Sequence, residues 1–188
     1  EGTTICAKNM PNSLAVIAIA EKGSLLYAPD VYMEKIAIGP GYPANTVSLD
    51  ASPTENIQAI ALAKGVPVTE VTACILDRPP HARLIEALRA KRAAIYLIGD
   101  GDVAGVIHTT DPEETGIDIY LGIGGAPEGV LAAAALRCIG GQMQARLQLN
   151  TEEKISRAAK MGISDPMKIY SIEDMASGDV LFSATGVT

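Results

Sequence analysis

Apolar and polar residues change their pattern near position 50 of this 188-residue chain. Before that position the pattern favours strands. Residues 14–20 form a continuous apolar run of strand length, LAVIAIA, and residues 24–39 contain apolar segments typical of one or two further strands. The turn between these segments leads us to expect an antiparallel meander, followed by a loop at residues 39–50 that contains GPGYPANT.

Strands and helices alternate from residue 52 onward. The first helix starts at a capping box, Ser52-Pro-Thr-Glu55, and Gly65 suits its end. This alternation predicts a layered α/β fold. We expect further helices at residues 81–92, 102–109, 127–139 and 150–162, and strands at residues 71–76, 95–98, 117–121, 143–149 and within 178–188.

The expected helix at residues 127–139 is apolar on all sides except at Arg137. A helix of this kind has no face suited to water, and it is therefore buried between other elements. We expect this helix to lie between two layers of the fold.

The composition limits the classes of function. Hydrophobic residues make up 48% of the chain, which supplies a sizeable core, and the net charge of −7 argues against nucleic acid or an anionic membrane as the main partner. No apolar run reaches the roughly 18 residues of a membrane helix, and no signal peptide is visible.

Three cysteines without metal-ligand spacing suggest buried thiols in a reducing compartment, so we expect a cytoplasmic protein. Two histidines exclude a His-rich metal site.

Polar residues follow three of the expected strands. Residues 77–81, DRPPH, follow the first; residues 99–102, GDGD, follow the second; and residues 122–129, GIGGAPEG, follow the third. Ligands of α/β sheets bind beyond the carboxyl ends of the strands. Three neighbouring strand ends would then place carboxylates, one arginine and glycine backbone around a common site.

Each of these segments also has a purely structural interpretation. Asp100 and Asp102 suit a turn and a helix N-cap, or they can accept hydrogen bonds from sugar hydroxyls or bind a divalent ion. Arg78 lies in a proline-stiffened connection, or its guanidinium binds a phosphate in a bidentate manner. We expect His81 to start a helix and His108 to lie on a helix surface.

The segment GIGGAPEG looks like a phosphate cradle, but it matches neither common nucleotide motif. The dinucleotide fingerprint requires a third glycine where this chain has Pro127, and the P-loop requires Lys and a hydroxyl where it has Val130 and Leu131. What remains is a helix N-terminus with Glu128 in its first turn. That carboxylate either complements the helix dipole or binds a metal. A nucleotide-binding oxidoreductase is disfavoured.

The whole chain resembles the class II fructose-1,6-bisphosphatases, whose cyanobacterial members also act as sedoheptulose-1,7-bisphosphatases. The resemblance rests on EGTTICAKNMPNSLAVIAIAEKG, YAPDVYMEKIAIGPG, DGDVAG, GIGGAPEGVLAAAALRCIGGQMQARL and FSATGVT. It implies the layered αβαβα sugar-phosphatase fold of the metal-dependent, lithium-sensitive phosphatases, here without its N-terminal part. Residues 1–50 would end the N-terminal subdomain as a strand meander, and residues 51–188 would form the C-terminal α/β subdomain.

The resemblance also implies an activity and a set of site residues. The expected reaction is hydrolysis of the 1-phosphate of fructose 1,6-bisphosphate, in the Calvin cycle and gluconeogenesis, by a water activated by Mg²⁺ or Mn²⁺. Glu1 and Glu128 are similar to metal ligands, and Thr3 to the residue that polarises the water. The implied substrate-binding residues are Glu1, Gly2, Thr3, Tyr32, Arg78, Pro79, Pro80, Asp100, Gly101, Asp102 and Gly125. Family members form homo-oligomers, often tetramers.

Two departures from the family pattern matter. Pro80 stands where family members often carry a second basic residue. This difference implies weaker binding of the substrate phosphate that is not hydrolysed. The aspartate that leads the Asp-Pro-[Ile/Leu]-[Asp/Glu]-Gly-Thr motif is not in this sequence, and Glu1-Gly2-Thr3 is the part that remains. We therefore expect residues 1–188 alone to be nearly inactive. The alternatives are another sugar or inositol phosphatase, and a non-catalytic sugar-phosphate-binding fragment.

Overall fold

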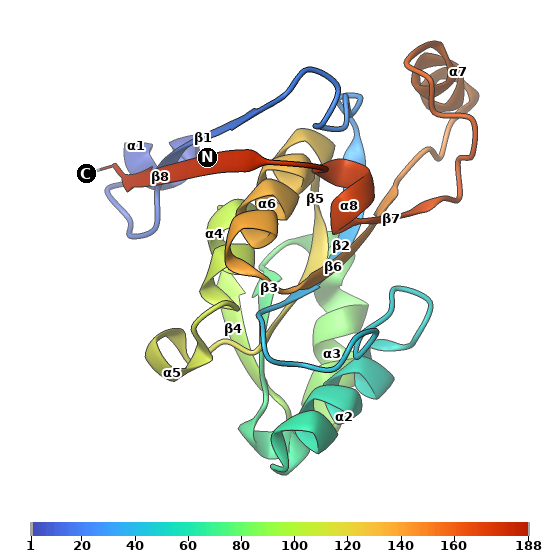
Figure 1. The fold of residues 1–188 in the computed structure, drawn as a ribbon. Coiled ribbons are helices and arrows are strands. Elements are labelled where there is room, and N and C mark those ends of the chain that lie inside the picture. The colour runs from blue at the N-terminus through green and yellow to red at the C-terminus, as the bar shows by residue number, and fades with distance from the viewer. Residues whose placement is uncertain (1, 188) are drawn as a thin grey trace.

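The computed structural model describes residues 2–187 (Figure 1). The strands are β1 (Leu14–Ala20), β2 (Tyr32–Ile38), β3 (Thr72–Leu76), β4 (Ala94–Ile98), β5 (Ile119–Gly125), β6 (Gln142–Leu147), β7 (Ile169–Ser171) and β8 (Val180–Gly186). The α-helices are α1 (Thr3–Ala7), α2 (Pro53–Lys64), α3 (Ala82–Ala90), α4 (Asp102–His108), α5 (Pro112–Thr115), α6 (Ala126–Ile139), α7 (Glu152–Lys160) and α8 (Ile172–Met175). Two 3₁₀ turns are η1 (Val68–Glu70) and η2 (Pro79–His81).

A six-stranded mixed sheet forms the centre of the molecule. Its strand order is β4-β3-β5-β2-β6-β7, with β3 parallel to β4 and β5 and the other pairs antiparallel. The predicted alternation of strands and helices after residue 52 is confirmed, and so is the mixed α/β class. The complete five-layer arrangement stays a prediction.

Two hydrophobic clusters cover the two faces of this sheet. Met33 and Ala37 of β2 belong to the cluster that includes α6, whereas Ile36 and Ile38 belong to the cluster that includes α2 and α3. Successive side chains of a strand point to opposite faces, so a strand apolar at consecutive positions is buried on both sides. This explains why β2 lies in the interior of the sheet.

Helix α6 lies between the six-stranded sheet and the β1–β8 pair (Figure 1). Ala132, Ala133 and Ala134 are buried, and their small side chains let neighbouring elements approach closely. The burial predicted from its all-round apolar character is confirmed. Its N-terminal end reaches the carboxyl end of β5 directly, since Gly125 is both the last residue of β5 and the N-cap of α6.

The predicted antiparallel meander over residues 1–50 is wrong. Strand β1 pairs with β8, from the other end of the chain, and β2 pairs with β5 and β6. Residues 21–31 connect the two sheets instead of forming a hairpin. Burial separates the two strands: alternate residues of β1 are exposed, whereas most of β2 is buried. Because β1 and β2 differ in burial and pair with different strands, they do not form a meander.

Strands from before and after the expected subdomain boundary near residue 50 pair with each other in the same sheets. Strand β2 pairs with β5 and β6, and β1 pairs with β8, so both sheets contain strands from each side of that position. The division into residues 1–50 and 51–188 stays a prediction.

The predicted burial of the cysteines is correct for Cys74 alone. Cys74 is fully buried in β3, and burial raises the pKa of its thiol to about 12. Cys6 and Cys138 are exposed. Cys138 lies near the end of α6, where the helix leaves the cover of its neighbours, so an apolar sequence context did not ensure burial.

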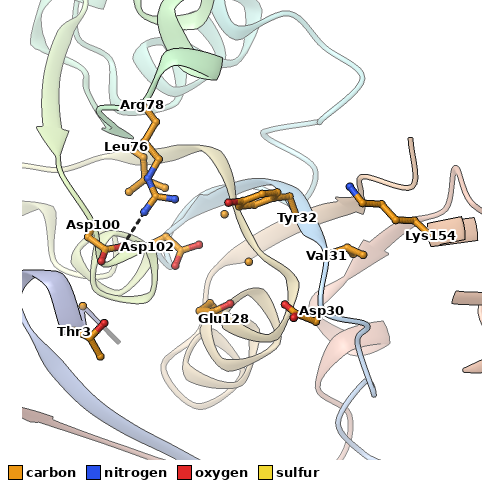
Figure 2. Close-up of a pocket in the computed structure, with 13 residues that line it drawn as sticks. Thr3, Asp30, Val31, Tyr32, Leu76, Arg78, Asp100, Asp102, Glu128 and Lys154 are labelled. Carbon is orange, nitrogen blue, oxygen red and sulfur yellow. Dashed lines mark hydrogen bonds and ion pairs between the residues drawn. The ribbon is translucent and has the colours of Figure 1, made fainter. Parts of the chain in front are cut away.

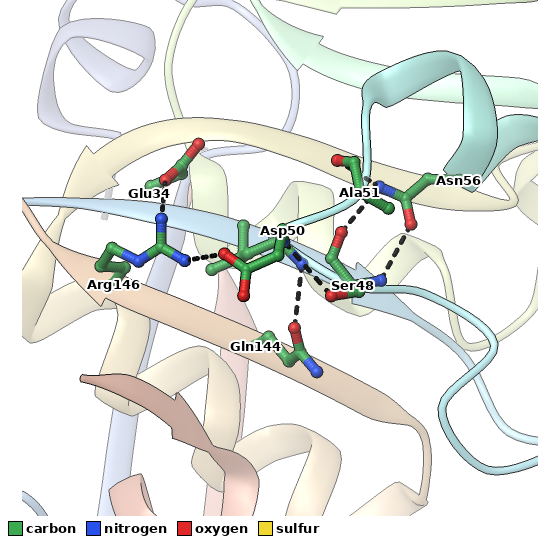
Figure 3. Close-up of polar contacts among 8 residues, drawn as sticks. Glu34, Ser48, Asp50, Ala51, Asn56, Gln144 and Arg146 are labelled. Atoms are coloured by element: carbon green, nitrogen blue, oxygen red, sulfur yellow. Dashed lines mark hydrogen bonds and ion pairs between the residues drawn. The ribbon is translucent and has the colours of Figure 1, made fainter. Parts of the chain in front are cut away.

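The predicted loop at residues 39–50 is tied to the sheet and to α2 by side chains (Figure 3). Asn56 accepts from the Ser48 backbone N–H at 2.9 Å and donates to the Ser48 carbonyl at 2.8 Å. Gln144 accepts from the Leu49 backbone N–H at 2.9 Å, and Arg146 bridges Asp50 and Glu34. The loop is therefore held in one position over β6.

Candidate active site

A cavity of about 520 Å³ lies at the carboxyl ends of the parallel strands, beside the first turn of α6 (Figure 2). Eight of the residues predicted from the sequence line it. They are Gly2, Thr3, Tyr32, Arg78, Asp100, Asp102, Gly125 and Glu128.

The predicted convergence of three strand ends is confirmed. Strands β3, β4 and β5 are parallel neighbours in the order β4-β3-β5, so their carboxyl ends share one edge of the sheet. Arg78 follows β3, Asp100 follows β4, and Gly125 ends β5. Each of the three lines the same cavity.

Four predicted site residues lie elsewhere. Glu1 is outside the described residues. Pro79 lines a separate depression beside α3, Pro80 lines another cavity under α2, and Gly101 is buried as the N-cap of α4. Roles of these residues in binding a substrate stay predictions.

The Arg78 guanidinium is paired with a carboxylate of the same site. Its Nη2 donates to Asp100 Oδ1 at 2.9 Å, and each side chain remains about one third exposed. Arg78 therefore faces the cavity with part of its charge compensated and with further N–H donors available. Asp100 keeps its second oxygen as an acceptor.

Asp102 forms an ion pair with Lys35, a residue that the sequence analysis missed. The Lys35 side chain is fully buried in β2, and Asp102 is nearly so. Glycines make room for the pair: a Cβ at Gly124 would collide with the Asp102 carboxylate, and one at Gly129 would lie 3.1 Å from Lys35 Cε. A lysine inside the apolar strand sequence YMEKIAI was the available signal, since a buried lysine requires a partner.

Glu128 lies in the first turn of α6, and its carboxylate folds over Gly125. A Cβ at Gly125 would collide with Glu128 Oε2, so the glycine is required for this approach. Figure 2 shows Glu128 and Asp30 on one side of the cavity, while Arg78 and Tyr32 lie on the other. Asp30 was not predicted; it precedes β2 in the connection between the two sheets.

Within residues 2–187, the cavity offers carboxylate oxygens suited to a hard divalent ion but not a complete ligand set. Glu128 and Asp30 offer the carboxylate oxygens that such ions prefer. Within residues 2–187, however, no group of three or more His, Cys, Asp or Glu side chains is placed to hold a metal ion. The described residues fit as part of such a site.

A second cation of the cavity, Lys154, comes from α7 and was also missed. Its Nζ donates to the neutral Asn150 Oδ1 at 3.0 Å. Among the described residues it forms no ion pair, in contrast to Arg78 and Lys35. Lys154 lies far along the chain from the motif residues, so nothing in its sequence context connected it to the cavity.

None of the helices in the described part of the chain combines the length and apolar content of a membrane span.

Curated relatives match the entire chain. A protein of Synechococcus sp. (strain JA-3-3Ab) is 43% identical over 201 aligned residues, which cover 100% of this chain and 57% of the relative. Proteins of Trichodesmium erythraeum (strain IMS101) and Synechococcus elongatus (strain ATCC 33912 / PCC 7942 / FACHB-805) are 42% and 40% identical and are each covered over 58% of their length. All three are named D-fructose 1,6-bisphosphatase class 2/sedoheptulose 1,7-bisphosphatase. The chain thus spans less than two thirds of these relatives.

The match to a family model is equally extensive. The model described as bacterial fructose-1,6-bisphosphatase, glpX-encoded, covers residues 1–188. The family predicted from the motifs in the sequence is therefore confirmed. This chain belongs to the glpX-encoded family of bacterial fructose-1,6-bisphosphatases.

Proposed function

We propose that this chain forms the larger part of the active site of a phosphoric monoester hydrolase that removes the 1-phosphate of fructose 1,6-bisphosphate. Sedoheptulose 1,7-bisphosphate is the expected second substrate, because both names occur in the curated relatives. The observation that carries the proposal is one cavity that contains Thr3, Glu128, Arg78 and Lys154 together. By resemblance to the family, whose members are often tetramers, the proposal extends to the αβαβα phosphatase fold and to a homo-oligomer.

The charges of the cavity suit a ligand with two phosphates. Each phosphate monoester carries a charge of about −1.5 to −2 at neutral pH, so both need compensation. Arg78 and Lys154 supply cations for the phosphate remote from the reaction, and the Tyr32 hydroxyl adds a hydrogen-bonding group. The side with Glu128 and Asp30 would repel a phosphate unless a divalent cation lies between them.

Glu1 and Glu128 would hold such a divalent ion, and Asp30 offers a further oxygen. When bound, Mg²⁺ or Mn²⁺ neutralises charge on the reacting phosphate and lowers the pKa of water. The residues of the chain would orient the reaction: the Thr3 hydroxyl, which lines the cavity, would hydrogen-bond the attacking water, and Gly2 and Gly125 would allow the backbone to approach the phosphate. Asp100 and Asp102 accept from the sugar hydroxyls with oxygens not used by their cations.

A panel of phosphate esters tests this proposal. With the full-length protein and Mn²⁺, phosphate release from fructose 1,6-bisphosphate should exceed release from inositol monophosphate and glycerol phosphate. Preference for inositol monophosphate would assign another phosphatase activity to the same fold.

The incomplete ligand set within residues 2–187 favours one second candidate, a non-catalytic sugar-phosphate-binding polypeptide. Residues 1–188 expressed alone separate the two functions. Binding of fructose 1,6-bisphosphate without phosphate release would support the binding function for that polypeptide, whereas robust turnover would exclude it.

A further inference from the structure

The parallel pairing of β3 with β5 ends before the cavity begins. Only Ala73 with Ile119 and Cys74 with Tyr120 are paired along this ladder. Strand β5 continues for five more residues to Gly125, whereas the chain after β3 turns away into the η2 segment. The separation of these strands opens the edge of the sheet where the cavity lies.

His81 fills the gap between the two separating strands. Its Nε2 accepts from the Ile123 backbone N–H at 2.8 Å, and its Nδ1 lies 2.8 Å from the Leu76 carbonyl oxygen. The ring is only 2% exposed. The side chain therefore connects β3 and β5 where backbone pairing between them has ended, and it joins Leu76, at the end of β3, to Ile123 of β5.

These two contacts fix the protonation state of the ring. Ile123 presents an N–H, so Nε2 must carry a lone pair, and the proton then lies on Nδ1 and is donated to Leu76. A protonated ring would place two N–H groups face to face at Ile123. Burial lowers the pKa of His81, with a smaller contribution from the charge of Arg78, in agreement with a neutral ring.

The ring joins the two segments that carry the opposite ends of the proposed site. The His81 backbone N–H donates to the Arg78 carbonyl at 2.9 Å, so the ring and Arg78 share one tight turn. Ile123 is followed directly by Gly124 and Gly125 and then by the first turn of α6, which carries Glu128. A displacement of the ring would alter the spacing between Arg78 and Glu128.

We propose that His81 is a positioning residue that sets the spacing between Arg78 and Glu128, and thereby the fit of a ligand carrying two phosphates. This inference rests on the proposed function, because it assigns Arg78 and Glu128 to opposite ends of a sugar bisphosphate. Gly122 supports the arrangement: a Cβ at that position would lie 3.3 Å from Nε2, so the glycine lets the ring approach β5.

Two substitutions separate positioning from general stability. His81→Gln keeps an acceptor at the distance of Nε2, whereas His81→Asn keeps a donor near Nδ1 and loses the acceptor for Ile123. In the full-length protein with Mn²⁺, kcat and KM are measured for fructose 1,6-bisphosphate and for fructose 1-phosphate, which lacks the remote phosphate. His108→Gln, a histidine that does not line the cavity, is the matched control.

We expect His81→Asn to lower kcat/KM for the bisphosphate roughly tenfold or more relative to fructose 1-phosphate, since misplacement of a binding group costs much of its effect. His81→Gln should restore the ratio to within about threefold of the parent. Should His81→Asn fold poorly, Gly122→Ala pushes on the same contact from β5 and is expected to change the ratio in the same direction. ¹⁵N spectra of the parent should show the Nδ1–H tautomer.

An active parent whose substrate ratio is unchanged in both His81→Asn and Gly122→Ala would overturn the role of His81 while leaving the proposed function intact. A parent that hydrolyses neither fructose ester would overturn the proposed function, and the positioning role would fall with it.

Discussion

Single residues differ in whether their charge is already compensated, and this difference defines the candidate site. Lys35 is neutralised by Asp102 inside the protein, and Arg78 is paired with Asp100 at the cavity wall. Lys154 reaches the cavity and donates to the Asn150 amide, and within residues 2–187 it forms no ion pair. An incoming phosphate thus competes with a described carboxylate for Arg78, whereas no carboxylate of residues 2–187 is paired with Lys154.

Lys154→Gln should therefore weaken binding of the bisphosphate. We expect KM for fructose 1,6-bisphosphate to rise roughly three- to tenfold, with a smaller change in kcat, because hydrogen bonds to charged groups contribute about 1.5–3 kcal/mol and this site is partly exposed. Lys160→Gln, an exposed residue of the same helix outside the cavity, is the control. Equal KM values for the parent and Lys154→Gln would exclude a phosphate contact.

Lys35→Met tests the buried pair. The substitution leaves the Asp102 carboxylate buried without a cation, and breaking such a pair destabilises a protein by about 3–5 kcal/mol. Denaturant unfolding should show this loss and a partial recovery in the Lys35→Met/Asp102→Asn double variant. The exposed Arg137–Glu173 pair is the contrast: Arg137→Met should cost about 1 kcal/mol or less. A loss as small for Lys35→Met would show that burial of Asp102 does not depend on its pairing with Lys35.

At the scale of elements, local signals predicted most of the helices and the parallel strands. The capping box at Ser52, proline and glutamate in the first turn of α6, and Gly65 act within a few residues, so they can be read from the chain. Pairing between distant elements could not be read in this way. The contact of β1 with β8 joins residues 160 to 172 positions apart, from Ala20–Val180 to Leu14–Gly186, and no local pattern encodes it.

The buried Asn56 amide is one of several side chains that hold the loop before α2, and Asn56→Ala should loosen this loop. Four backbone groups, the Ser48 N–H and the carbonyls of Ser48, Ala51 and Ser52, would lose a partner or a shared partner, and unsatisfied buried groups cost about 1–3 kcal/mol each before water enters. Denaturant unfolding should show a loss of about 1–3 kcal/mol. Gln58→Ala, exposed on the same helix, should change stability by less than about 0.5 kcal/mol, and an equal loss in both variants would contradict this role.

At the scale of the molecule, the sequence predicted the family, the fold class and most of the cavity wall. The residues it missed, Asp30, Lys35, Lys154 and the inward ring of His81, belong to elements whose position depends on the sheet order. The central place of β2 brings Asp30 to the cavity and Lys35 into contact with Asp102, and helix α7, which follows β6, brings Lys154. Their functions follow from topology and not from a local motif.

The global stability should depend on pH through the two histidines. Burial lowers the folded-state pKa of His81 and of His108, so the unfolded chain binds protons first as the pH falls below about 6.5. The stability from the neutral rings is fully present above that pH and is lost as the pH falls toward the lowered pKa values. The free energy of unfolding should therefore decrease as the pH is lowered from about 7.5 to about 5. Its dependence on pH should be weaker in His81→Gln than in the parent. An identical slope in parent and variant would contradict a neutral buried ring.

The proposed function depends most on Glu128, in the first turn of α6, which we propose to hold a divalent ion for phosphate hydrolysis. The most direct test is phosphate release from fructose 1,6-bisphosphate by full-length Glu128→Gln over a range of Mn²⁺ concentrations, with Mn²⁺ binding measured in parallel. Glu113→Gln, exposed on α5, is the control. We expect Glu128→Gln to lose roughly 100-fold or more in kcat and to bind Mn²⁺ more weakly, since metal ligation and charge neutralisation supply several kcal/mol. Full turnover at saturating Mn²⁺ would contradict this proposal and would leave Glu128 as a helix-start residue.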